Sequence, residues 1–120
     1  MAIEKAKVKE KDEAFLLNIF ELNLQRAVQA CIDMANVVIA KEGLGLPNQY
    51  RQSFELLAKN SIIGDDLLKI MVSMVGFRNI SVHDYSEVKP EVVKAIVDKH
   101  LVDFEKFYST IFNYTNSSWK

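Results

Sequence analysis

The sequence predicts an all-α fold, an antiparallel bundle of four to five helices that forms one domain of residues 1–120. Two long segments, residues 12–40 and 91–114, contain neither glycine nor proline and repeat apolar residues every three or four positions. This is the spacing of one face of an α-helix. No segment shows the alternation of apolar and polar residues that is typical of a β-strand. A chain of 120 residues is long enough to bury a core without disulfide bonds or metal ions.

The first predicted helix covers residues 12–40 and would be roughly 43 Å long. Its apolar stripe suits an antiparallel bundle or a dimer interface, and two small residues within it would allow a close approach of a neighbouring helix. The chain has one cysteine, which excludes an intrachain disulfide and agrees with a cytoplasmic protein. The stripe consists of Leu17, Phe20, Leu24, Ala27, Cys31, Met34 and Val38.

Two shorter helices are predicted after a loop at residues 41–48, which contains two glycines and a proline. The first covers residues 49–59 and is expected to bury Tyr50, Phe54 and Leu57. After a turn at residues 62–64, Asp65 can cap a helix that is apolar almost all round. We expect this to be the central and most buried helix.

A last helical region is predicted from Pro90, which suits the first turn of a helix, to about Tyr114. No breaker interrupts this region after Pro90, and a kink near His100 is the alternative to a straight helix. His100 itself should be exposed. The final residues from Thr115 should be frayed, with Trp119 in solvent. The apolar stripe of this region consists of Val93, Val97, Leu101, Phe104, Tyr108 and Ile111.

Charge and hydropathy narrow the classes of function. Fifteen basic and sixteen acidic residues give a net charge of -1, which argues against binding nucleic acid by general neutralisation of phosphates. Any contact with RNA would therefore be local. No run of apolar residues approaches the length of about 18 that a membrane helix needs, and no apolar signal segment follows Met1. We expect no membrane association.

Residues 78–85 are the most informative segment, because they combine a permanent cation, a proton-transfer group and a phenol directly after the apolar helix. The guanidinium of Arg78 is a planar fork of donors that fits phosphate oxygens. His83 can give or take a proton near neutral pH. Together these side chains indicate phosphodiester chemistry.

The spacing of these residues limits how they can meet. On an ideal α-helix Arg78 and Tyr85 share a face, whereas His83 is rotated from Arg78 by about 140°. The three side chains therefore cannot converge on one straight helix. Convergence requires a helix end or kink within residues 79–82, or a second copy of the chain that supplies the missing group.

Structural interpretations of the same residues stand beside the functional ones. Arg78 could complement a helix dipole, His83 could cap the helix, and Tyr85 could be a half-buried packing residue. His83 and Asp84 are also similar to the metal-binding doublet of HD phosphohydrolases. Those enzymes need further ligands, and His100 is the only other histidine. We therefore expect no metal site and no cofactor.

Three more polar residues are candidates for support of a cleft. Arg26 and Asp33 are seven positions apart in the first helix and face the same way. They could form a structural ion pair or a solvated stripe. Alternatively Arg26 adds positive potential to the cleft and Asp33 orients it. Asn79, directly after Arg78, is the third candidate.

A family resemblance rests on residues 77–79 and 82–85. Phe77-Arg78-Asn79 followed by Val82-His83-Asp84-Tyr85 resembles the Arg-x-x-x-x-His-x-Tyr signature of the HepT-like toxins, the HEPN partners of minimal nucleotidyltransferases. Other parts of the chain resemble the first helix and the next block of that family, so the likeness covers nearly the whole sequence. These parts are residues 24–27, 31–33, 47, 50 and 53–58.

The resemblance implies a dimeric HEPN-like bundle in which arginine and histidine of both chains line a cleft and act as a metal-independent ribonuclease. Arg78 would hold the scissile phosphate and stabilise its transition state. His83 would act as general acid or base around attack by the RNA 2′-hydroxyl. Tyr85 would accept AMP from a cognate nucleotidyltransferase antitoxin, which would silence the site. The implied partners are a second copy of the chain, the antitoxin and RNA.

Two alternatives remain open at this point. The chain could be a non-catalytic helical module that binds substrate or nucleotide for a partner nucleotidyltransferase. It could also be a plain dimeric bundle whose polar cluster serves the interface.

Overall fold

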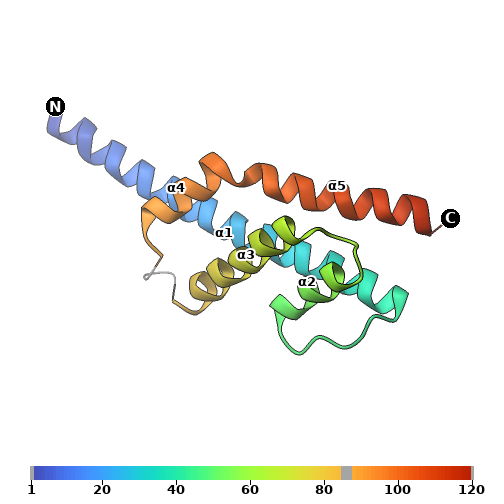
Figure 1. Ribbon diagram of the computed structural model, residues 1–120. Helices are drawn as coiled ribbons and strands as arrows, with labels where there is room; N and C mark the ends of the chain where they lie inside the picture. The colour runs from blue at the N-terminus through green and yellow to red at the C-terminus, as the bar shows by residue number, and fades with distance from the viewer. Residues whose placement is uncertain (1, 85–87, 120) are drawn as a thin grey trace.

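The computed structural model describes residues 2–84 and 88–119, with side chains from residue 12 onwards, and this part of the chain is helical without a strand. The predicted all-α fold class is therefore confirmed. None of the described helices is long and apolar enough to cross a membrane. The helices, labelled in Figure 1, are α1 (Ala2–Glu42), α2 (Tyr50–Lys59), α3 (Asp65–His83), α4 (Pro90–Lys99) and α5 (Leu101–Ser118).

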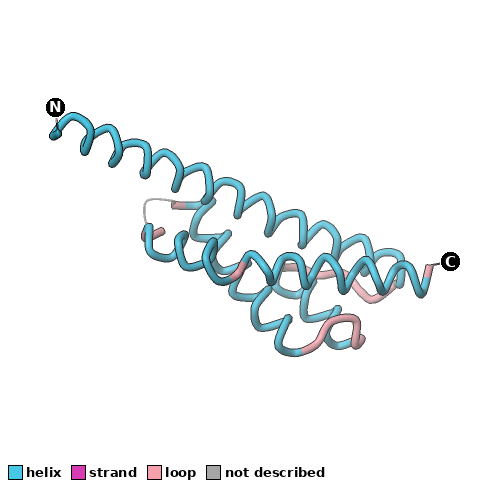
Figure 2. The backbone as a smooth tube through the Cα atoms, turned by 90° about the horizontal axis from the view of Figure 1, so that it is seen from above, coloured by secondary structure: helices cyan, strands magenta, loops and turns pink. Residues whose placement is uncertain are grey.

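Helix α1 is the central element, because it packs against each of the other four helices. The sequence predicted this position for the helix at residues 65–77, and that prediction is wrong. Helix α3 runs antiparallel to α1, whereas α5 runs in the same direction as α1 and ends beside its C-terminus (Figures 1 and 2). The N-terminal part of α1 extends beyond the other helices in both views.

Helix α1 begins earlier than the predicted start at residue 12. Its 41 residues correspond to about 62 Å of helix, and the longest dimension of the molecule is 62 Å. The added turns are rich in lysine and glutamate, which favour helix without producing an apolar stripe. Phe20 of the predicted apolar stripe is 41% exposed, although it lines a hollow with Val97 of α4, so this part of the stripe is not buried within one copy of the chain.

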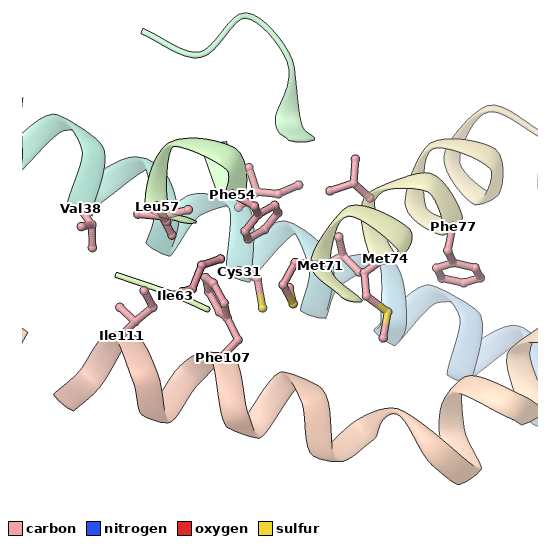
Figure 3. Close-up of a cluster of buried hydrophobic side chains, with 14 of the residues drawn as sticks. Cys31, Val38, Phe54, Leu57, Ile63, Met71, Met74, Phe77, Phe107 and Ile111 are labelled. Atoms are coloured by element: carbon pink, nitrogen blue, oxygen red, sulfur yellow. The ribbon is translucent and has the colours of Figure 1, made fainter. Parts of the chain in front are cut away.

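The hydrophobic core lies where α1, α2, α3 and α5 meet (Figure 3). Phe54 and Phe107 form its centre with an edge-to-face contact, with ring centroids 5.4 Å apart and planes at 78°. The predicted core residues Leu24, Cys31, Val38, Phe54 and Leu57 are all buried. Burial raises the pKa of the Cys31 thiol from 9.0 to about 12.

Helix boundaries differ from the prediction in two places. Gly64 occupies the N-cap position of α3, so Asp65 does not cap the helix but adds negative charge in its first turn. The last helical region, predicted as one stretch that allowed a kink near His100, is divided there into α4 and α5. His100 is only partly exposed, with Nδ1 2.8 Å from Oδ2 of the buried Asp103. The break shifts the helical register, so that Phe107 is buried and Tyr108 is exposed.

The C-terminal end of α5 is attached to the end of α1. Trp119 Nε1 donates a hydrogen bond to Glu42 Oε1 at 2.8 Å, and the hydroxyl of Tyr114 donates to the same oxygen at 3.0 Å. The Nζ atom of Lys41 lies 6.0 Å from the centroid of the Trp119 ring. The predicted fraying from Thr115 is therefore wrong, and Trp119 is partly buried.

Candidate functional site

Helix α3 continues without interruption to His83, and the N–H of Asp84 still donates to the carbonyl of Ile80 at 2.8 Å. A helix end or kink within residues 79–82 is therefore not found. Arg78 and His83 lie on the last two turns and point in directions about 140° apart. Of the two routes to convergence, only a second copy of the chain remains.

The last turn of α3 is fixed to α1 by a buried polar cluster. Ser81, between Arg78 and His83, is only 2% exposed. Its Oγ donates to Glu21 Oε2 at 2.6 Å and accepts from Gln25 Nε2 at 2.5 Å. This cluster was not predicted from the sequence. The available signal was the pair of polar residues four apart, Glu21 and Gln25, near the apolar face of α1 that contains Leu24 and Val28.

Arg78 is partly buried and rests on an aromatic ring. Its Cζ lies 4.9 Å from the centroid of the Tyr50 ring, which is a cation–π distance. Nε of Arg78 is buried and has no hydrogen-bond partner among the described residues. Tyr50 was predicted to be buried, but it is 42% exposed. This contact orients the guanidinium at the edge of a groove.

The groove lies between the start of α2 and the second half of α3. It has a volume of about 550 Å³ and is lined by Asn48, Gln49, Tyr50, Arg51, Val75 and Asn79. Asn79 is one of the lining residues, and its support of a catalytic cleft stays a prediction. Arg51 is the cation that lines the groove, and its Nε lies 2.8 Å from Glu55 Oε1.

The remaining predicted residues lie in three places. His83 is exposed at the C-terminal end of α3. Arg26 and Asp33 are both exposed on α1, where Asp33 Oδ1 accepts a hydrogen bond from Gln29 Nε2 at 2.9 Å. Tyr85 lies outside the described residues. The catalytic, switch and support roles given to these residues stay predictions.

Among the described residues, no group of three or more histidine, cysteine, aspartate or glutamate side chains is arranged to hold a metal ion. The chemistry available at the groove is that of Arg51, an exposed aromatic ring and two asparagine amides, with Arg78 packed against that ring. Such a surface can bind a phosphate and an adjacent planar base.

Comparisons with known proteins give a consistent family assignment. A family model for HepT-like ribonucleases matches residues 2–111. A curated relative from Shewanella oneidensis, described as mRNA nuclease HepT, is 48% identical over 90 residues, which span 75% of this chain and 68% of that protein.

Solved structures agree with that assignment. A toxin–antitoxin crystal structure with AMP-PNP has 43% sequence identity and a TM-score of 0.79, covering 86% of this chain and 79% of the other. The tri-AMPylated HEPN toxin of Shewanella oneidensis in complex with the MNT antitoxin has 46% identity and a TM-score of 0.74, with coverage of 78% and 70%.

Proposed function

This chain belongs to the HepT-like family of ribonucleases, and on that premise we propose that it is the RNA-cleaving toxin of a toxin–antitoxin pair. Its proposed antitoxin is a nucleotidyltransferase, as in the complex of the similar Shewanella oneidensis toxin. The observation that carries the proposal is the placement of Arg78 and His83 on the last two turns of α3, the first beside a groove and the second in solvent.

The proposed reaction uses protein groups alone and no metal ion. Arg78 binds the non-bridging oxygens of the scissile phosphate and stabilises the charge that develops there. The RNA 2′-oxygen attacks phosphorus, the bond to the 5′-oxygen breaks, and a 2′,3′-cyclic phosphate and a 5′-hydroxyl result. A histidine takes the proton of the attacking hydroxyl or gives one to the leaving oxygen, and His83 is suited to either role.

We propose that the active form is a homodimer. One face of α1 leaves four apolar side chains exposed. Packing of these side chains against a second copy would remove apolar surface from water. It would also allow the partner to complete the pair of Arg78 and His83. The four apolar side chains are Phe15, Ile19, Leu22 and Val37, and Arg26 and Asp33 lie on the same face.

Tyr85 is the proposed site of inactivation. It follows His83 by two positions, and addition of AMP there would place bulk and a negative phosphate near Arg78. Intact mass measurement after co-expression with the nucleotidyltransferase should show added AMP units, and Tyr85→Phe should remove them. AMP mapped only to another residue would refute this switch.

The ribonuclease function is tested with purified protein and a single-stranded RNA in the presence of EDTA. The wild type should cleave, and Arg78→Ala and His83→Ala should each lower the rate by at least about 100-fold. Arg78→Lys should not restore it, because lysine lacks the planar fork. Expression of the wild type alone should arrest growth, and either alanine variant should relieve the arrest while keeping the thermal unfolding midpoint.

The same assay separates the proposal from its alternative, a non-catalytic subunit that binds substrate or nucleotide for the nucleotidyltransferase. The net charge of -1 favours that alternative to a small degree, because it gives little long-range attraction for RNA. Tight binding to the partner together with intact RNA, with and without EDTA, would support the binding subunit and refute the ribonuclease.

A further inference from the structure

We propose that the groove between α2 and α3 is a nucleotide-binding subsite, which holds single-stranded RNA through Tyr50 and Arg51 beside the reacting phosphate at Arg78. This inference rests on the proposed function. It adds two residues, Tyr50 and Arg51, that the signature segment at residues 78–85 does not contain.

Tyr50 supplies a surface on which a base can stack. Arg78 rests on its ring at 4.9 Å, and the side chain is still 42% exposed and lines the groove. Unstacked bases of single-stranded RNA are commonly held on tyrosine rings and arginine planes. The pair therefore offers an aromatic surface directly beside the cation that is proposed to bind the reacting phosphate.

Arg51 supplies a second phosphate contact. Its pair with Glu55 is exposed on both sides, with side chains 58% and 45% exposed. Exposed pairs of this kind contribute little to stability, so an RNA phosphate can compete for Arg51. Arg51 on the groove and Arg78 against the ring of Tyr50 also provide local positive charge that a chain of net charge -1 otherwise lacks.

The wall of the groove is held in place before any ligand binds. The backbone N–H groups of Asn48 and Gln49 donate to Gln52 Oε1 at 2.6 and 3.3 Å. These two backbone donors are already used, so they are not available to a ligand. The amides of Asn48 and Asn79 line the groove and can donate to and accept from base edges.

The volume and composition of the groove favour RNA over an acidic protein segment. About 550 Å³ falls within the range of about 300–1,000 Å³ that is usual for small-ligand sites. An acidic peptide would use only the positive charge of the groove. A nucleotide would also use the exposed aromatic ring and the flanking amides. Binding of the antitoxin to this groove is the competing explanation, and the experiment below distinguishes it from RNA binding.

The test measures binding of a fluorescein-labelled single-stranded RNA by anisotropy in EDTA, with all variants made in a His83→Ala background to prevent cleavage. Tyr50→Ala should weaken binding on the order of tenfold, while Tyr50→Phe keeps the ring and the affinity. Arg51→Gln should weaken binding and reduce the slope of log affinity against log salt by about 0.7. Tyr108→Ala and Lys106→Gln, exposed on α5, are matched controls and should change neither quantity.

A second background separates direct binding from an indirect effect through Arg78. In the double variant Arg78→Gln, His83→Ala, the change Tyr50→Ala should still weaken RNA binding severalfold if the ring contacts RNA. No further loss in that background would mean that Tyr50 only positions Arg78, and would overturn the subsite.

The outcomes also separate this inference from the proposed function. A wild type that cleaves RNA with an affinity indifferent to Tyr50 and Arg51 would overturn the subsite alone. A wild type that never cleaves, with Tyr50-dependent RNA binding in the His83→Ala background, would support the subsite and refute the ribonuclease. If Tyr50→Ala and Arg51→Gln weaken binding of the antitoxin but not of RNA, the groove belongs to the antitoxin and the subsite is overturned.

Discussion

Arg78 is held against the ring of Tyr50, and this contact sets the direction of its guanidinium. The charge of Arg78 and its spacing from His83 are read directly from residues 78–83, and so is the rotation of about 140° between them. Its contact with Tyr50 could not be predicted, because it depends on how the loop after α1 returns α2 to α3. The same limit applies to Ser81, whose partners are 56 and 60 positions away.

Ser81 should be important for the stability of the fold near the site. Ser81→Ala leaves the buried carboxylate of Glu21 without its hydroxyl donor. We expect a loss of about 1–3 kcal/mol in the free energy of unfolding, measured by urea denaturation. Ser73→Ala, at an exposed position of the same helix, is the control. Equal stability of the two variants would contradict the role of the cluster.

Cys31 should be protected by its burial. Because burial raises the pKa of its thiol to about 12, the thiolate is scarce in the native protein at neutral pH, and a thiol reagent should react far faster after unfolding. Stability should fall as pH rises from about 9 to 12, because in that range only the unfolded chain releases the proton. Rapid native labelling at pH 7 would show that the core opens frequently.

The helices themselves were largely predictable, and the errors have physical causes. The apolar spacing and the loop residues before it predicted α2. The break at His100 was not predicted by that spacing, which continues from Val93 to Ile111, and no glycine or proline marks it. The early start of α1 was missed because its first turns form helix without an apolar face. The exposure of Phe20 could not be predicted, because the sequence does not show where neighbouring helices stop covering α1.

The link between the ends of α1 and α5 is testable with the single tryptophan of the chain. Glu42→Ala removes the acceptor of both Trp119 and Tyr114, so Trp119 should become more exposed and its fluorescence emission should shift to the red. The hydrogen bond from Tyr114 to Glu42 raises the pKa of the Tyr114 hydroxyl. In Glu42→Ala this pKa should therefore fall toward its ordinary value. Glu105→Ala, exposed on α5, is the control. Unchanged emission and titration would show that the link does not persist in solution.

The molecule as a whole presents an elongated bundle with a site at the end of one antiparallel helix. Its principal dimensions are 62 × 26 × 20 Å, and the projecting half of α1 carries exposed apolar side chains. A near-neutral chain gains little from long-range attraction of RNA, so a dimer that brings two copies of Arg78 together would concentrate positive charge where it is needed. This assembly is the central proposal, since one straight α3 cannot make Arg78 and His83 converge.

Complementation between two inactive variants tests that proposal most directly. Chains carrying Arg78→Ala and His83→Ala, each with its own affinity tag, are co-expressed, and mixed dimers are isolated over both tags. If Arg78 of one chain works with His83 of the other, one of the two sites in the mixed dimer is intact. Cleavage of RNA in EDTA should then return to about half the wild-type rate per dimer, with both parent variants inactive. A mixed dimer as inactive as its parents, beside an active doubly tagged wild type, would contradict the shared site.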